Sequence, residues 1–133
     1  MEKYIGTKHI EAEPAQKDGE DGYKVVYEDG YVSWSPKDVF EKAYKKSGYM
    51  SFGHAIEALK AGKRAARKGW NGKNQYIELA TCISYKNTAE ETINAEHEAI
   101  GNKAIAFVGT SGVQLGWLAS QADMLAEDWE VFD

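Results

Sequence analysis

The N-terminal part of the chain carries short runs of β-branched and aromatic residues separated by polar turns. Residues 23–27 and 31–34 are rich in Tyr and Val, and Glu28-Asp29-Gly30 separates the two runs. Glycine readily takes the positive φ of a tight turn, so this pattern predicts a β-hairpin. Residues 4–10 are expected to add a third strand, with residues 14–21 as a polar loop before the hairpin.

A helix is expected directly after this hairpin. Ser35 is a candidate N-cap, Pro36 suits the first helical position because no N–H is needed there, and Asp38 is the acidic residue three positions on. Apolar residues then recur on one face until Gly48, where the helix should end. Residues 1–48 are therefore expected to form a small β-β-β-α unit.

The spacing becomes helical again at Ser51, a second candidate N-cap. Phe52, Ile56 and Leu59 recur at intervals of four and three residues before Gly62, which predicts a helix that packs by one face. Several β-prone segments follow this helix. The segments expected to be strands are residues 63–68, 75–83, 104–108, 115–118 and 129–132.

The end of the chain repeats the helix-capping pattern. Ser120 and Asp123 have the spacing of a capping box and predict a short helix through Ala126. Residues 87–102 are polar and receive no assignment. Together the patterns predict an α+β fold, in which residues 51–133 form an antiparallel sheet with packed helices, preceded by the small β-β-β-α unit.

Composition excludes several classes of protein. The chain has 133 residues and 43% hydrophobic content, enough for one ordinary domain or two very small ones. It has no run of 18 apolar residues and no apolar stretch at its start, so we expect a cytoplasmic protein that does not contact a membrane. The single Cys82 cannot form an internal disulfide, and the scattered His9, His54 and His97 form no recognisable metal site.

The net charge of −5 is unevenly distributed along the chain. Residues 1–50 carry −2, residues 51–75 carry +5 and residues 76–133 carry −8. A basic segment inside an acidic protein suggests a site for a small anion, because a long nucleic acid would also meet the negative surroundings. The alternative is that these basic residues form internal salt bridges.

No motif supplies a catalytic nucleophile together with its base, so no catalytic residue is assigned and no enzyme is expected. The adjacent carboxylates at Glu90-Glu91 and Glu127-Asp128 would point to opposite faces of a strand, and we interpret them as surface charges. The glycine run at residues 109–112 lacks the Lys-Ser/Thr pair of a phosphate-binding loop.

The tryptophans are more informative. Trp70 lies within Gly69-Trp70-Asn71-Gly72, and Trp117 lies near a helix start, so both are candidates for stacking on a nucleobase. Trp34 and Trp129 lie on expected strands beside apolar residues and are favoured as core residues. Core packing is also the alternative for the first pair.

Two blocks of sequence resemble a known family. They read SFGHAIEALKAGKRAARKGWNG at residues 51–72 and WLASQADMLAEDW at residues 117–129. These blocks are similar to the signature blocks of the Thoeris anti-defence type 2 proteins of phages, in the same order. The first 48 residues resemble a separate small module of phage proteins, through YIGTK near the start and GYVSWSPK in the expected hairpin.

This resemblance implies a protein that sequesters a signal. Members of the family bind glycocyclic ADP-ribose, the second messenger of bacterial TIR-domain proteins, and keep it from the Thoeris effector without degrading it. Some relatives also hold cyclic di- or trinucleotides. The resemblance further implies a homotetramer with ligand pockets between subunits. No metal or cofactor is expected.

The ligand contacts that the resemblance implies fall on the two blocks. They are Arg67, Trp70, Asn71, Trp117, Ser120, Gln121 and Asp123. Either tryptophan would stack on the adenine, and the uncharged polar residues and the aspartate would bond base edges and ribose hydroxyls. Arg67 or the neighbouring Lys68 would face the diphosphate. The residues that begin the last helix also have a capping role, and a helix N-terminus favours a phosphate oxygen.

The chain departs from the family pattern at two places. Gly116 stands where members often have proline before the tryptophan of the second block, which could shift that ring. The loop at residues 82–102 looks longer, which could change the choice of ligand. There are two rival hypotheses. The first is a nucleic-acid-binding phage accessory protein, whose binding affinity would fall steeply as salt rises. The second is a phosphodiesterase that cleaves the signal, which would leave a cleaved product.

Overall fold

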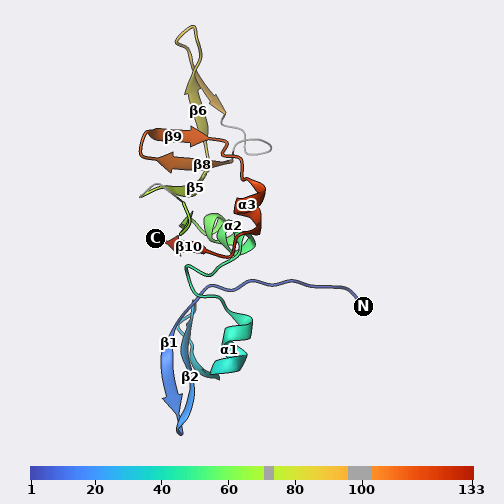
Figure 1. The fold of residues 1–133 in the computed structure, drawn as a ribbon. Helices are drawn as coiled ribbons and strands as arrows, with labels where there is room; N and C mark the ends of the chain where they lie inside the picture. The colour runs from blue at the N-terminus through green and yellow to red at the C-terminus, as the bar shows by residue number, and fades with distance from the viewer. Residues whose placement is uncertain (71–73, 96–102) are drawn as a thin grey trace. The chain divides into compact units, whose positions relative to one another are not determined.

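The structure of the chain is a computed structural model that describes residues 1–70, 74–95 and 103–133. The chain divides into two compact units, Met1–Lys45 and Lys46–Asp133 (Figure 1). Both units contain antiparallel strands together with short helices. This architecture confirms the predicted α+β class.

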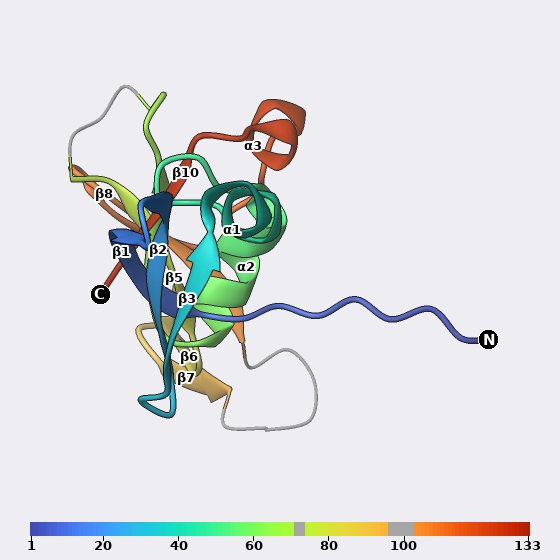
Figure 2. The same ribbon diagram turned by 90° about the horizontal axis from the view of Figure 1, so that it is seen from below.

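The N-terminal unit is a three-stranded antiparallel sheet with one helix. Its elements are β1 (Ile10–Lys17), β2 (Glu20–Tyr27), β3 (Val32–Pro36) and α1 (Lys37–Ala43). β2 lies between β1 and β3, and β3 runs directly into α1, which packs against β2 and β3 (Figure 2). The order β-β-β-α and the hairpin turn at Gly30, which has a φ of 88°, are confirmed.

The first strand lies later in the chain than the sequence pattern predicts. Residues 4–10 were expected to form it, but β1 begins at Ile10 and continues through residues expected to be loop. Asp18 and Gly19, both with positive φ, form the tight turn into β2. The prediction is wrong because proline is typical of loops but is also tolerated on an edge strand, and β1 is at the edge of its sheet.

The helix α1 also differs from its prediction. Its N-cap is Pro36, which makes no side-chain capping bond, while Ser35 still pairs with Tyr23 in the sheet. The helix ends at Ala43 because Tyr44 is extended, with φ −130° and ψ 145°. The predicted N-cap Ser35 is therefore part of the β2–β3 pairing and does not cap the helix.

A small core holds this unit together. Val25 is buried, and the Phe40 ring stacks on Tyr23 and Tyr44 with centroid distances of 4.2 and 5.0 Å. Trp34 is partly buried, and its Nε1 donates to the carbonyl of Ala15 at 2.9 Å. The edge strand β1 is largely exposed, and only Ile10 and Ala15 in it are partly buried.

The C-terminal unit is built on a five-stranded antiparallel sheet of order β10-β4-β5-β8-β9 (Figure 1). The bounds of these strands are β4 (Arg64–Arg67), β5 (Tyr76–Ala80), β8 (Ala104–Gly109), β9 (Gly112–Leu115) and β10 (Trp129–Phe132). The other elements are α2 (Phe52–Lys60), α3 (Gln121–Leu125), β6 (Ile83–Lys86) and β7 (Thr92–Ala95). α2 packs against β10, β4 and β5 and contacts α3.

Most elements of this unit lie where the sequence predicts them. There are three exceptions. Residues 75–83 divide into β5 and the start of the separate β6–β7 hairpin, β7 lies within residues 87–102, which received no assignment, and the expected strand 115–118 shares only Leu115 with β9. The strand β9 ends at Leu115, because Gly116 has a φ of 80° and turns the chain out of the sheet. In residues 75–83, apolar residues occur on both sides of the bend at Thr81 and Cys82, so the sequence pattern does not show the break. At Gly116, the strand ends because glycine readily takes a positive φ.

The core of this unit lies between α2 and the sheet. It consists of the buried residues Ala55, Leu59, Ala65, Ile77 and Trp129. The predicted N-cap Ser51 is confirmed, since its Oγ accepts from the backbone N–H of His54 at 3.2 Å and the His54 side chain accepts from the Ser51 N–H. Across the described ranges, none of the helices is long and apolar enough to cross a membrane.

Candidate functional site

An aromatic cluster forms where α2, two strands and two connecting segments meet. It consists of Phe52 of α2, Trp70 after β4, Phe107 of β8, Trp117 after β9 and Trp129 of β10. Trp117 contacts each of the other four rings. The Trp70 ring centroid lies 5.4 Å from that of Phe107, 6.1 Å from that of Trp117 and 5.4 Å from that of Trp129. These three contacts are edge-to-face, the geometry that aromatic quadrupoles favour. Trp129 is fully buried, which confirms its predicted core role, whereas Trp70 and Trp117 keep part of their surface exposed.

Trp117 reaches this cluster through the glycine that departs from the family pattern. The N–H groups of Gly116 and Trp117 both donate to the carbonyl of Ile105, at 3.1 and 2.9 Å. The φ of 80° at Gly116 is outside the range of proline, whose ring holds φ near −65°. A proline before the tryptophan would therefore need a different backbone here.

An ion-pair network lies beside the aromatic cluster. Arg67, at the end of β4, donates from Nη1 to Asp123 Oδ1 and from Nε to Asp128 Oδ1, both at 2.9 Å. The side chains are only 20%, 13% and 32% exposed for Arg67, Asp123 and Asp128. The guanidinium is therefore held between two carboxylates in a partly buried place, and its hydrogen bonds to Asp128 and Asp123 raise its pKa.

Asp123 joins this network to the aromatic cluster and to α3. Its Oδ1 also accepts from Trp70 Nε1 at 3.3 Å, and its Oδ2 accepts from the Ser120 N–H at 3.1 Å. Ser120 Oγ in turn accepts from the Asp123 N–H at 3.0 Å, which confirms the predicted capping box. Burial favours the neutral acid, but the bonds from Arg67, Ser120 and Trp70 outweigh it and lower the pKa of Asp123.

Asp128 is part of the same network, and interpreting it as a surface charge was wrong. Its Oδ2 accepts from the Gly69 N–H at 3.0 Å while Oδ1 binds Arg67. Burial again favours the neutral acid, and the bonds from Arg67 and Gly69 outweigh it, so the pKa of Asp128 is lowered. Two ionised carboxylates thus face one guanidinium, and the network carries a net negative charge.

The basic segment 51–75 is largely paired within the chain. Lys60 pairs with Glu57 at 3.4 Å, and Lys63 pairs with Asp133 at 2.6 Å. Arg64 donates to the Asp133 carbonyl and lies over the rings of Tyr76 and Phe132. Internal salt bridging, the alternative left open by the sequence, therefore accounts for most of the described cations of this segment.

Lys68 has a different setting from these cations. It is exposed, and its Nζ lies 4.1 Å from the centroid of Tyr49, a ring that is itself 61% exposed. Its stem crosses Gly48, where an added Cβ would lie 2.4 Å from the Lys68 Cε. No sequence pattern indicates a role for Tyr49, because this residue lies between two expected helices.

The predicted site residues divide into three groups. Arg67, Trp70, Trp117, Ser120 and Asp123 lie together in the cluster and network described above. Gln121 is exposed on the first turn of α3. Asn71 lies outside the described residues.

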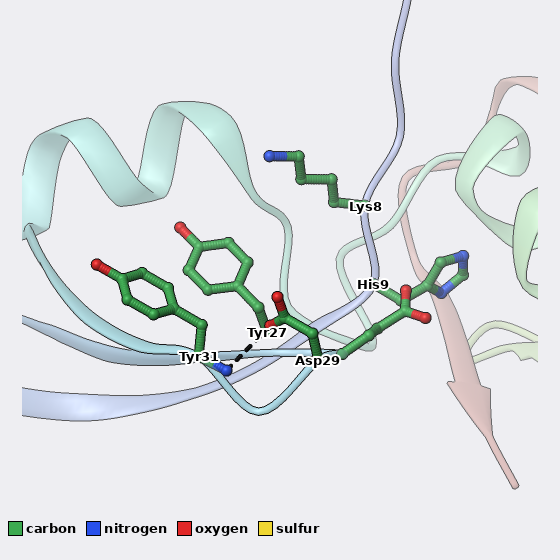
Figure 3. Close-up of a pocket in the computed structure, with 6 residues that line it drawn as sticks. Lys8, His9, Tyr27, Asp29 and Tyr31 are labelled. Carbon is green, nitrogen blue, oxygen red and sulfur yellow. Dashed lines mark hydrogen bonds between the residues drawn. The ribbon is translucent and has the colours of Figure 1, made fainter.

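A separate open cavity lies in the N-terminal unit (Figure 3). It has a volume of about 470 Å³ and is lined by Lys8, His9, Tyr27, Glu28, Asp29 and Tyr31. The rings of Tyr27 and Tyr31 stack with centroids 5.8 Å apart, and the Lys8 Nζ lies 5.7 Å from the first ring. None of the predicted site residues that the structure describes lines it. Within the three described ranges, no group of His, Cys, Asp or Glu is placed to hold a metal ion.

Fold and site together define a small α+β domain whose antiparallel sheet carries partly exposed tryptophans braced by an arginine-carboxylate network. Residues 50–132 match the family model described as the Thoeris anti-defense 2-like domain. The chain belongs to this family. It is also 40% identical over 87 residues to Thoeris anti-defense 2 of Bacillus phage SP01, an alignment that covers 62% of this chain and 93% of that protein.

The match confirms the family suggested by the two sequence blocks and gives the chain a role in phage anti-defence. The matched region begins at residue 50, so it includes the aromatic cluster and the ion-pair network. The three-stranded sheet, α1 and the cavity of the N-terminal unit lie outside it.

Proposed function

We propose that this protein counters defence by binding and sequestering cyclic nucleotide immune signals without cleaving them. The proposed ligand is glycocyclic ADP-ribose, the signal made by TIR-domain proteins, and cyclic di- and trinucleotides are proposed as further ligands. The observation that carries the proposal is the pair of partly exposed indoles, Trp70 and Trp117, within the domain that matches the anti-defence family. Aromatic faces of this kind stack on nucleobases.

The charges near these indoles favour Lys68 over Arg67 as the contact for the diphosphate. Arg67 is held by two carboxylates, so approach of a phosphate to its guanidinium would also bring the phosphate close to Asp123 and Asp128. Lys68 is exposed and follows Arg67 at the end of β4. The Lys68 ammonium lies over the exposed Tyr49 ring, and we propose that the diphosphate approaches it there.

The polar residues then take two different roles in the proposed site. The side chains of Ser120 and Asp123 form the capping box, and Asp123 also binds Arg67 and Trp70. We therefore propose that these two residues position the site and do not contact the ligand. Gln121 is exposed at the start of α3 and is proposed to bond a base edge or a ribose hydroxyl. Asn71 keeps its proposed contact from the sequence.

Sequestration requires affinity rather than chemistry. A protein that removes a signal by stoichiometry needs a dissociation constant near or below the signal concentration, and nanomolar binding corresponds to about −12 kcal/mol. Stacking and several hydrogen bonds in a largely pre-formed pocket can supply such an affinity. We propose that the pocket is completed between subunits of a homotetramer.

The pairing of the basic segment within the chain disfavours the rival nucleic-acid-binding function.

Calorimetric titration with glycocyclic ADP-ribose, a cyclic dinucleotide and a cyclic trinucleotide tests this function. We expect saturable binding of glycocyclic ADP-ribose that changes little between low and moderate salt, since few counterions are released. Lys68→Ala should weaken binding roughly tenfold, as loss of one charge-assisted contact does. Lys86→Ala, which removes an exposed lysine from the β6–β7 hairpin, is the matched control and should bind like the wild type.

Two outcomes would contradict the proposal. The first is that none of the three nucleotides binds the wild-type protein. The second is that single-stranded nucleic acid binds more tightly than any of them, with an affinity that falls steeply as salt rises.

A further inference from the structure

The turn that carries Trp70 is fixed by one residue far along the chain. The Trp70 N–H donates to the Arg67 carbonyl at 3.2 Å and closes a four-residue turn. Within this turn, the Lys68 N–H donates to the backbone carbonyl of Asp128 at 3.2 Å, and the Gly69 N–H donates to its Oδ2 at 3.0 Å. Both central N–H groups of the turn therefore donate to Asp128.

Asp128 is itself held firmly. Its Oδ1 accepts from Arg67 Nε at 2.9 Å, and the next residue is the fully buried Trp129. Trp129 exchanges backbone hydrogen bonds with Met50, both at 3.1 Å, and its Nε1 donates to the Asp123 carbonyl at 3.0 Å. The position of the turn is thereby tied to the core of the unit.

The chemistry of this contact requires a carboxylate. Asp128 accepts one hydrogen bond on each side-chain oxygen, from Arg67 and from Gly69. An asparagine of the same shape would turn its NH₂ group toward one of these donors, so one of the two bonds would be lost. Glycine at position 69 also matters, because an added Cβ would lie 3.0 Å from Asp128 Oδ2.

We propose that Asp128 is the positioning residue of the nucleotide site. It acts through the turn, because it sets where the Trp70 ring enters the aromatic cluster and where Lys68 leaves the sheet. This inference rests on the proposed function, and it gives a role to a residue that the sequence pattern placed among surface charges. A turn that is ordered before binding leaves less conformational entropy to be lost when the ligand arrives.

The test combines amide hydrogen exchange, followed residue by residue by NMR, with nucleotide titration of the full chain. In Asp128→Asn we expect exchange of the Gly69 amide at least tenfold faster than in the wild type, with the amides of β5 unchanged. If the turn is then ordered in about one molecule in ten, the apparent dissociation constant for glycocyclic ADP-ribose rises about tenfold. Asp128→Ala should show both effects more strongly.

Asp133→Ala is the matched control, because it removes a carboxylate that pairs with Lys63 and lies away from the turn. It should change neither the Gly69 exchange rate nor the affinity. The inference is overturned if Gly69 exchange is unchanged in Asp128→Asn, or if exchange accelerates while affinity stays within twofold of the wild type. If the wild-type protein binds no nucleotide, the proposed function fails, and the exchange rates alone decide whether Asp128 holds the turn.

Discussion

At the scale of single residues, one guanidinium joins distant parts of the chain. Arg67 donates to Asp123, 56 residues further on, and to Asp128, 61 residues further on, and no local spacing connects these residues. The two tryptophans of the proposed site were visible from their turn and helix signals, because such signals are local. Their mutual distance was not, since it depends on how β4 and the segment after β9 meet in the folded sheet.

The network predicts how stability depends on pH. The pKa values of Asp123 and Asp128 are lower in the folded protein than in an unfolded chain, so their ionised forms favour folding. This stabilisation is complete above the ordinary aspartate pKa of about 3.9, and it is lost as the pH falls through the lower folded-state values. Chemical unfolding measured from pH 7 to pH 2 should therefore show a free energy of unfolding that declines below about pH 4.

Asp123→Asn provides the comparison for this prediction. The variant should be less stable than the wild type at pH 7 because Arg67 loses one anionic partner, and its decline in acid should be shallower. Glu127→Gln, at an exposed neighbouring position, should reproduce the wild-type curve. If the free energy of unfolding of Asp123→Asn declined in acid as steeply as that of the wild type, the Asp123 carboxylate would not contribute to the pH dependence of stability.

At the scale of elements, side-chain signals located helices well where no strand competed for the same residues. Ser51 and Ser120 were both identified as N-caps, and both form capping boxes. The third candidate, Ser35, failed because β3 pairs with β2 as far as Gly22 and Pro36. Sheet pairing is a non-local interaction, so a local capping pattern cannot anticipate where it ends.

The capping box of α3 gives a prediction at this scale. α3 has five residues, too few to be stable alone, so its cap and its contacts must hold it. Ser120→Ala removes the acceptor of the Asp123 N–H and should lower the free energy of unfolding by about 1 kcal/mol. Denaturant unfolding checks this, with Ser111→Ala in the β8–β9 turn as the control. A change as small as that of the control would mean that contacts, and not the cap, hold α3.

At the scale of the whole molecule, the net charge of −5 conceals a local arrangement. The basic segment was visible from the sequence, but its partners were not, because Asp123, Asp128 and Asp133 come from the acidic end of the chain. These aspartates pair with Lys63 and Arg67 and so link β4 to β10 and α3. The exposed Lys68 remains beside the turn as the cation proposed to meet a small anionic ligand.

The central claim is that the protein sequesters its nucleotide and leaves it intact. The most direct measurement is to incubate the protein with a slight excess of glycocyclic ADP-ribose, isolate the complex by gel filtration, denature it by heat and identify the released nucleotide by mass spectrometry. We predict recovery of unchanged glycocyclic ADP-ribose in fixed stoichiometry with the protein. Release of ADP-ribose or another linear product, or elution of the protein without nucleotide, would contradict the account.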